Sequence, residues 1–345
     1  MTTTHPHSTH GKRPELVPYG ETNLGTPLEL VEGPVVGNDL FFVRSNYTVP
    51  TVDPDRWRLR VHGLVDREVE LSLADLRQLP QRSVTAVLEC AGNGRIRFAP
   101  TMDGTPWHDD AVGCARWSGV PLRHVLDLAG LRPDVVDIVS QGADDPAMRR
   151  GLPLRAALTD DCLLALDMNG APLPIAHGAP VRLLVPGWAG IASTKWIVDL
   201  EAIPHTFDGY WNAEKYVMVS ASGQVLSRVE EMPVKSVIAR PSAGSVLPPG
   251  PVTASGYAWS GTGSIEAIDV CVGDGQFARA DITHAAGPRA WVGWSYSWVA
   301  PPGPVTVRSR ARDSTGQVQP LEPIWNAQGY LMNAVGQQSF VIADA

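Results

Sequence analysis

Charged residues are scarce in this sequence: they make up 19% of its 345 residues, where a quarter is usual. Acidic residues outnumber basic ones, 36 to 28, and the formal net charge is −8. A nucleic-acid-binding protein needs a basic face for phosphate contacts, so this balance argues against one. The sequence also contains no run of 18 apolar residues, and we therefore expect no membrane-spanning helix.

Cysteine is sparse as well: there are four, and no two are spaced as CxxC. This leaves zinc knuckles, iron–sulfur clusters and c-type haem attachment unsupported, and we expect no haem. Four cysteines are too few for a disulfide scaffold in a chain of this length. The first residues lack the apolar segment of a signal peptide and carry no twin-arginine pair, so we expect a cytoplasmic location.

Glycine and proline are plentiful, with 33 and 30 residues, which indicates many turns and short strands. Up to about residue 225, strands alternate with short helices. The apolar pattern predicts strands over 83–90 and 193–200 and helices over 73–79 and 122–131. These features are typical of an α+β domain.

The pattern changes beyond a polar segment at 220–232, which we interpret as a connector. Seven strands follow, separated by Pro/Gly turns at intervals of roughly 8–14 residues, and the last is predicted over 330–342. Such spacing is typical of a β-sandwich. We therefore place a domain boundary near residue 225 and expect an all-β second domain.

Cys90 is the first candidate for chemistry. It ends a predicted strand and opens a glycine-containing loop, with Arg95 five residues further on. Loop N–H groups and a nearby cation favour a thiolate, which could act as a nucleophile or as a soft metal ligand. The alternative is a buried structural cysteine, which is the usual state of a free cysteine.

A second candidate site lies in the predicted strand–loop–strand over 177–196. Its chemistry-bearing residues are His177, Arg182, Ser193, Thr194 and Lys195. The cations supply charge and the glycines between them let backbone N–H groups approach, so the segment could cradle an anion. It lacks the GxxxxGK[ST] pattern of a P-loop. A solvated loop is the alternative interpretation.

Six blocks of the sequence resemble the sulfite oxidase family. The block VLECAGNGR at 87–95 resembles that family's molybdenum-ligating segment, and FFVRSN at 41–46 resembles the segment that precedes it. The other blocks are at 166–174, 177–196, 256–261 and 323–326. They occur in order, with compatible gaps, over about 40–345. The sequence is therefore identified as a member of this family.

The resemblance implies an arm at 1–38, a molybdopterin-binding α+β domain at 39–225 and an immunoglobulin-like dimerisation domain at 226–345. It also implies a homodimer and a molybdenum–molybdopterin cofactor with one pterin per metal. Cys90 would be the metal ligand. The implied cofactor-binding residues are Phe42, Val43, Arg44, Ser45, Asn46, Cys90, Asp144, His177, Arg182, Ser193, Thr194 and Lys195. The implied catalytic residues are Cys90, Arg44, Arg95, Trp107, Tyr216 and Gln328.

The activity implied by the resemblance is oxidation of sulfite to sulfate, with electrons passed to an unidentified external acceptor. Sulfite is anionic, so Arg44 and Arg95 would supply donors to it. The sequence departs from many relatives at Asn46, Gln328 and Ala192, which replace His, Arg and Arg. Each lost cation weakens an anion site. A nitrate or sulfoxide reductase with the same cofactor is therefore the alternative.

Two further classes of function are less consistent with the six blocks. A hydrolase would use Cys90 as nucleophile and His177 as base, and would need the two side chains within hydrogen-bond reach. A non-catalytic binding protein would carry its interaction on the second domain and would hold no metal.

Overall fold

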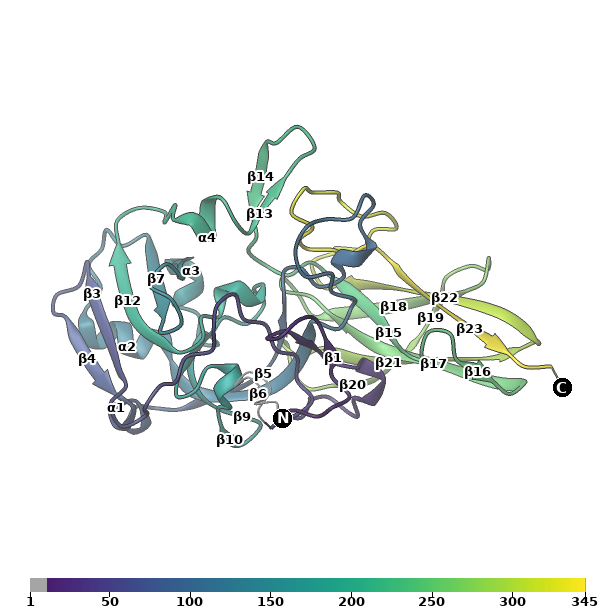
Figure 1. Ribbon diagram of the computed structural model, residues 1–345, viewed down its shortest axis with the longest axis horizontal. Helices are drawn as coiled ribbons and strands as arrows, with labels where there is room; N and C mark the ends of the chain where they lie inside the picture. The colour runs from purple at the N-terminus through teal and green to yellow at the C-terminus, as the bar shows by residue number, and fades with distance from the viewer. Residues whose placement is uncertain (1–10, 345) are drawn as a thin grey trace, which may run out of the picture.

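The computed structural model describes residues 11–344, which form mostly short strands arranged in two parts (Figure 1). Residues 1–10 of the predicted arm lie outside this range. The first part, up to about residue 230, carries two main sheets, one antiparallel and one mixed, together with short helices. The second part is built from strands alone. In the described residues, no helix has the length and apolarity needed to cross a membrane.

The first part contains two five-stranded sheets. One has the order β10-β9-β6-β5, with β11 also paired to β9; its strands are β5 (Arg82–Glu89), β6 (Val112–Pro121), β9 (Leu163–Met168), β10 (Ala171–Pro172) and β11 (Arg182–Leu184). The other has the order β4-β3-β12-β7-β8; its strands are β3 (Arg58–Gly63), β4 (Val69–Ser72), β7 (Asp137–Gly142), β8 (Arg149–Pro153) and β12 (Ile197–Ile203). Apolar side chains of both sheets share one buried cluster.

The helices of the first part begin and end where local chemistry requires. At α1 (Leu73–Gln78), Ser72 and Asp75 form the reciprocal hydrogen bonds of a capping box. The other α-helices are α2 (Leu122–Ala129), α3 (Leu154–Ala157) and α4 (Tyr210–Ala213). The sequence predicts α2 to residue 131, but it stops earlier because Gly130 adopts a left-handed conformation, with φ of 71°.

The second part consists of two sheets packed face to face, as predicted. One has the order β15-β17-β21-β20; its strands are β15 (Lys235–Arg240), β17 (Gly250–Trp259), β20 (Asp281–Ala285) and β21 (Val292–Ala300). The other has the order β16-β23-β22-β18-β19; its strands are β16 (Val246–Leu247), β18 (Ile265–Val272), β19 (Ala278–Arg279), β22 (Gly303–Asp313) and β23 (Gly336–Ile342). Alternate side chains from both sheets form the buried core between them.

Three local predictions are wrong. The segment expected to be a connector at 220–232 contributes to a hairpin of β13 (Val217–Val219) and β14 (Val225–Arg228), which projects from the body (Figure 1). The strand predicted over 193–200 begins only at Ile197, because Gly190–Ala192 form a 3-10 turn, η5, and the Ser193 N–H donates to Gly190 O. The strand predicted over 330–342 begins at Gly336.

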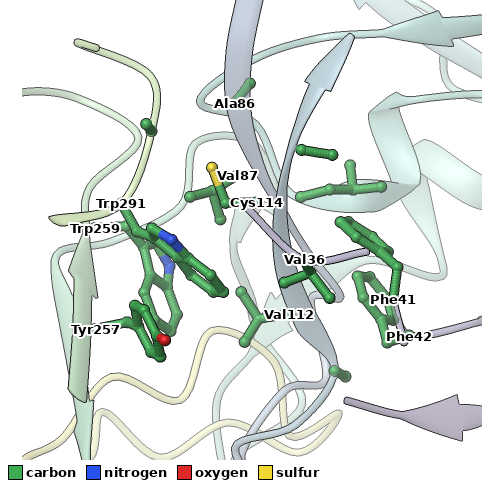
Figure 2. Packing of buried hydrophobic residues seen from close by; sticks show 14 of the residues in the cluster. Val36, Phe41, Phe42, Ala86, Val87, Val112, Cys114, Tyr257, Trp259 and Trp291 are labelled. Carbon is green, nitrogen blue, oxygen red and sulfur yellow. The ribbon is translucent and has the colours of Figure 1, made fainter. Parts of the chain in front are cut away.

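The two parts and the N-terminal segment share a core (Figure 2). That segment contains β1 (Val17–Pro18), β2 (Leu24–Gly25) and a 3-10 turn, η2 (Leu28–Leu30). Phe41 and Phe42 pack in the same cluster as Tyr257 and Trp291 of the second part, whose rings stack with centroids 4.2 Å apart. From Leu28 onward the segment therefore contributes buried residues to this shared core.

Candidate active site

Most of the predicted cofactor residues line one pocket, which we call the first pocket. They are Phe42, Arg44, Ser45, Asn46, Cys90, Asp144, His177, Arg182, Ser193, Thr194 and Lys195. The structure does not bring Val43 into it. Because neighbouring residues of the extended segment face opposite ways, Val43 packs in a separate apolar cluster and exchanges backbone hydrogen bonds with Leu24.

A second pocket adjoins the first. Arg44, Asn46, Cys90 and Tyr216 line both pockets. The second pocket further includes the predicted residues Arg95 and Gln328 and the unpredicted residues Asp103, Gly104, Thr105, Trp211, Lys215, Ala327 and Tyr330. Trp107 lines neither pocket. It is fully buried, and its ring lies 4.5 Å from that of Tyr19.

Cys90 lies where the two pockets meet. It directly follows β5 and its N–H donates to Ala111 O, which continues the β5–β6 pairing by one residue. The chain then turns sharply, with Asn93 N–H donating to Cys90 O and Gly94 at φ 83°. Cys90 thus ends a strand and opens a loop, as the sequence pattern predicts, and this position places the thiol at both pockets.

Arg95 is oriented by carbonyls and by an aromatic ring. Its Nε donates to Gly329 O at 3.2 Å and its guanidinium donates to Thr105 O at 2.8 Å. The guanidinium also lies over the ring of Tyr330, 5.2 Å from its centroid. A Cβ at Gly92 would stand 2.5 Å from this guanidinium, so residue 92 must be glycine for Arg95 to take this position.

The first pocket holds buried cations. Arg182 donates to the carbonyls of His177 and Ser193, and Lys195 donates to the Ser45 hydroxyl at 2.8 Å. Burial lowers the pKa of Arg182 to about 9 and holds the pKa of Lys195 well below its ordinary value. Desolvating these charges is costly, which favours a bound anion that offsets the cost.

His177 lies on a 3-10 turn, η4 (Ile175–His177), and belongs to the same group of buried side chains. Burial, followed by the charges of Lys12, Arg182 and Lys195, holds its pKa well below the ordinary value. Its Nε2 lies 2.6 Å from Lys12 Nζ, so this nitrogen already has a partner other than the Cys90 thiol. The arrangement does not support a Cys–His hydrolase.

One carboxylate, Asp144, lines the first pocket. Burial raises its pKa, while the charge of Lys195 opposes that rise. Three other lining residues, Arg44, Arg182 and Lys195, are basic, so the pocket gathers positive charge in a chain of net charge −8. A soft thiol, several cations and the aromatic side chain of Phe42 suit a phosphate-bearing pterin that holds a soft metal.

The second pocket carries two of the three departures noted in the sequence, Asn46 and Gln328. Arg44 donates to Asn46 Oδ1, and Asn46 in turn reaches Tyr216 Oη at 3.5 Å. Gln328 donates to Glu214 O at 2.8 Å, and its buried Oε1 has no hydrogen-bond partner within residues 11–344. Ala192 lines neither pocket and packs in the apolar cluster of the first part.

Sequence reasoning missed Lys12, Lys215 and Tyr330. Tyr330 stacks on Tyr216 with ring centroids 4.9 Å apart. The sequence pattern assigns Tyr330 to a strand over 330–342 and so gives no sign of a role in a pocket. Lys12 lies far from the motif blocks, and no local pattern identifies it. Only the folded chain brings Lys215 and Tyr330 to the second pocket and Lys12 to His177 beside the first.

Comparison with known proteins defines the class. The oxidoreductase molybdopterin binding domain matches residues 46–211, and the Mo-co oxidoreductase dimerisation domain matches residues 227–337. The molecule is thus a molybdenum-cofactor oxidoreductase with a second domain of the dimerisation type. It is 35% identical to a sulfite oxidase of Gallus gallus over 343 residues, which cover 90% of this chain and 74% of that protein. The chain belongs to the sulfite oxidase family.

Two further comparisons agree with this assignment. The mitochondrial sulfite oxidase of Homo sapiens is 34% identical over 336 residues, which cover 89% of this chain and 62% of that protein. This chain therefore spans less than two thirds of the human relative. The solved structure of the sulfane dehydrogenase SoxCD from Paracoccus pantotrophus superposes with a TM-score of 0.88 at 27% identity, covering 100% of this chain and 95% of that one. The predicted fold class is confirmed.

Proposed function

We propose that this protein oxidises sulfite to sulfate at a molybdenum–molybdopterin cofactor, with one pterin per metal and no haem in the chain. The observation that carries the proposal is the position of Cys90. Its side chain lines both the cation-rich first pocket, which suits an anionic pterin, and the second pocket, where Arg44 and Arg95 suit an oxyanion. A metal held at Cys90 would therefore lie within reach of substrate.

The proposed reaction converts sulfite and water into sulfate, two protons and two electrons, and the electrons pass to an external acceptor. When bound, the cofactor would supply the two-electron redox chemistry and oxygen transfer. Arg44 and Arg95 would hold the substrate oxygens by charge-assisted hydrogen bonds. Tyr216 would donate its hydroxyl hydrogen to the same group, and Gln328 would line the wall beside it.

The remaining predicted residues would bind the cofactor. Arg182 and Lys195 would supply charge to its phosphate, and His177 would supply an N–H donor. Ser45, Asn46, Ser193 and Thr194 would contribute polar contacts, Phe42 would cover the pterin ring, and Asp144 would accept from pterin N–H groups.

The two family matches, at residues 46–211 and 227–337, support a proposed division into domains. We assign residues 1–38 to an arm, 39–225 to the molybdopterin-binding domain and 226–345 to an immunoglobulin-like domain that forms a homodimer. A twofold pair is the commonest oligomer of soluble proteins. Light scattering at micromolar concentration tests the pair, and a mass near the 37.1 kDa of one chain would contradict it.

A cytoplasmic location is also part of the proposal. It is supported by four cysteines that are all free of disulfide bonds. Fractionation of cells that produce the full-length protein, followed by immunodetection, tests this location. Recovery outside the cytoplasm would contradict it.

The decisive experiment measures sulfite-dependent ferricyanide reduction on protein whose molybdenum content has been determined. Turnover should be lost in Cys90→Ser. Cys271→Ser is the matched control, because Cys271 is buried in the second part and lines neither pocket. Fully loaded wild-type protein without sulfite turnover would overturn the substrate. Nitrate and sulfoxide reduction would then be assayed, since the uncharged amide of Gln328 makes the second pocket less cationic.

A further inference from the structure

Lys12 makes three polar contacts from the N-terminal segment. Its Nζ lies 2.5 Å from Asn38 O, 2.9 Å from Phe41 O and 2.6 Å from His177 Nε2. A lysine ammonium carries three N–H donors and no acceptor. The three neighbours therefore match its hydrogen-bonding capacity, and a protonated Lys12 leaves His177 Nε2 as an acceptor.

We propose that Lys12 is a positioning residue that fixes His177 as the Nδ1–H tautomer, so that the imidazole offers a single N–H to an anionic cofactor in the first pocket. The inference rests on the proposed function, because it assumes that the cofactor occupies that pocket. Lys12 acts through His177, which lines the pocket. Fixing one ring nitrogen of a histidine sets which atom the other presents.

The surroundings of His177 keep its ring neutral. Burial and the neighbouring cations Lys12, Arg182 and Lys195 disfavour a second proton on the ring, and they outweigh the Asn38 backbone, which favours it. A neutral imidazole carries one N–H, and a hydrogen bond accepted at Nε2 places it on Nδ1. The ring of Phe41 meets the imidazole edge-on, with centroids 5.3 Å apart, and restricts rotation of the imidazole.

Lys12 also joins two walls of the first pocket. Its carbonyl partners, Asn38 and Phe41, lie just before the segment that begins at Phe42, whereas His177 lies on η4. The side chain thus connects both segments at one point. Asp39 is the acidic group that favours the charged form of Lys12, whereas burial opposes it. Loss of the Lys12 ammonium should therefore change the tautomer of His177 and weaken binding of the cofactor.

The other tautomer of His177, with its proton on Nε2, can be distinguished by experiment. A neutral lysine would donate to the two carbonyls and accept from His177 Nε2–H, which gives the other tautomer. Nitrogen-15 NMR of histidine-labelled full chain, purified free of cofactor, separates the two forms. The His177 signals are assigned with His177→Gln.

We expect the Nδ1–H form in the wild type at pH 6 and a shift toward Nε2–H in Lys12→Met. Arg13→Met is the matched control, because Arg13 is adjacent in sequence and pairs with exposed Glu15. It should leave the tautomer unchanged. The proposal would be overturned if His177 carried its proton on Nε2 in the wild type. It would also be overturned if Lys12→Met left the tautomer of His177 unchanged.

A second measurement concerns retention of the cofactor. Holoprotein of each variant is dialysed, and the pterin remaining is followed as its fluorescent oxidation product. Loss should be about tenfold faster in Lys12→Met than in Arg13→Met, as expected when a charge-assisted hydrogen bond is removed. Equal rates in the two variants would contradict the proposed effect on the cofactor. Wild-type protein that never carries a pterin would refute the proposed function, whereas the tautomer measurement would still decide the role of Lys12.

Discussion

Lys235 Nζ lies 3.3 Å from Oε1 of Glu89, the residue that precedes Cys90. Lys235 belongs to β15 in the second part, is fully buried, and also lies 2.9 Å from Asp109 Oδ1. The other oxygen of Glu89 accepts from Trp259 Nε1 at 2.9 Å. A buried network of charges thus fastens the end of β5 to the second part.

We expect Lys235→Met to destabilise the protein strongly. The substitution leaves Glu89 and Asp109 without their shared cation, and breaking a buried ion pair costs about 3–5 kcal/mol. The free energy of unfolding in urea measures this loss. Arg60→Gln is the control, because its pair with Glu68 is exposed and should contribute less than about 1 kcal/mol. Equal losses in the two variants would show that the network contributes little.

Gln328→Arg should lower the KM for sulfite. Gln328 lines the second pocket with an unpartnered Oε1, and an added guanidinium there would gain a charge-assisted bond to the anion. Such a bond contributes about 1.5–3 kcal/mol, which corresponds to a KM change on the order of tenfold or more. Gln224→Arg adds the same charge at an exposed turn outside both pockets. An equal change in that variant would indicate a general charge effect.

Sulfate should stabilise cofactor-free protein more at pH 6 than at pH 9. Burial lowers the pKa of Lys12 to about 7 and that of Arg182 to about 9. Between each lowered pKa and its ordinary value the unfolded chain binds more protons, so the stability of the cofactor-free protein rises with pH in that window. A bound anion favours the protonated cations and opposes this trend. Melting temperatures with millimolar sulfate or chloride, in wild type and Lys195→Met, measure the effect. A sulfate-specific shift that does not depend on pH would contradict it.

Trp107→Phe should reduce stability and leave sulfite binding unchanged. Trp107 is fully buried against Tyr19 and lines neither pocket. Loss of part of a buried ring costs about 1–3 kcal/mol. Steady-state kinetics should show the same KM as wild type, whereas Arg95→Met should raise KM about tenfold or more. A raised KM in Trp107→Phe, at temperatures where it stays folded, would place this side chain at the substrate.

The sequence predicts secondary structure well where the determining pattern lies within neighbouring residues. The helix predicted over 73–79 forms as α1, and the alternation over 83–90 places Cys90 at the end of a strand. Convergence of His177 with Arg44 is not visible in spacing, and its prediction required the family resemblance. Neither local patterns nor the family resemblance identified Lys12 and Lys235, because their roles depend on contacts between segments distant in the chain.

Lys235 and Tyr330 have a consequence for how the protein is made. Both reach the surroundings of Cys90 from the second part, which is synthesised later. A nascent chain that has left the ribosome only as far as residue 225 lacks Lys235, so Glu89 has lost its cation and Asp109 keeps only Arg97. Its second pocket also lacks Ala327, Gln328 and Tyr330. We therefore expect stable insertion of the proposed cofactor to follow synthesis of the second part, whose residues complete the surroundings of Cys90.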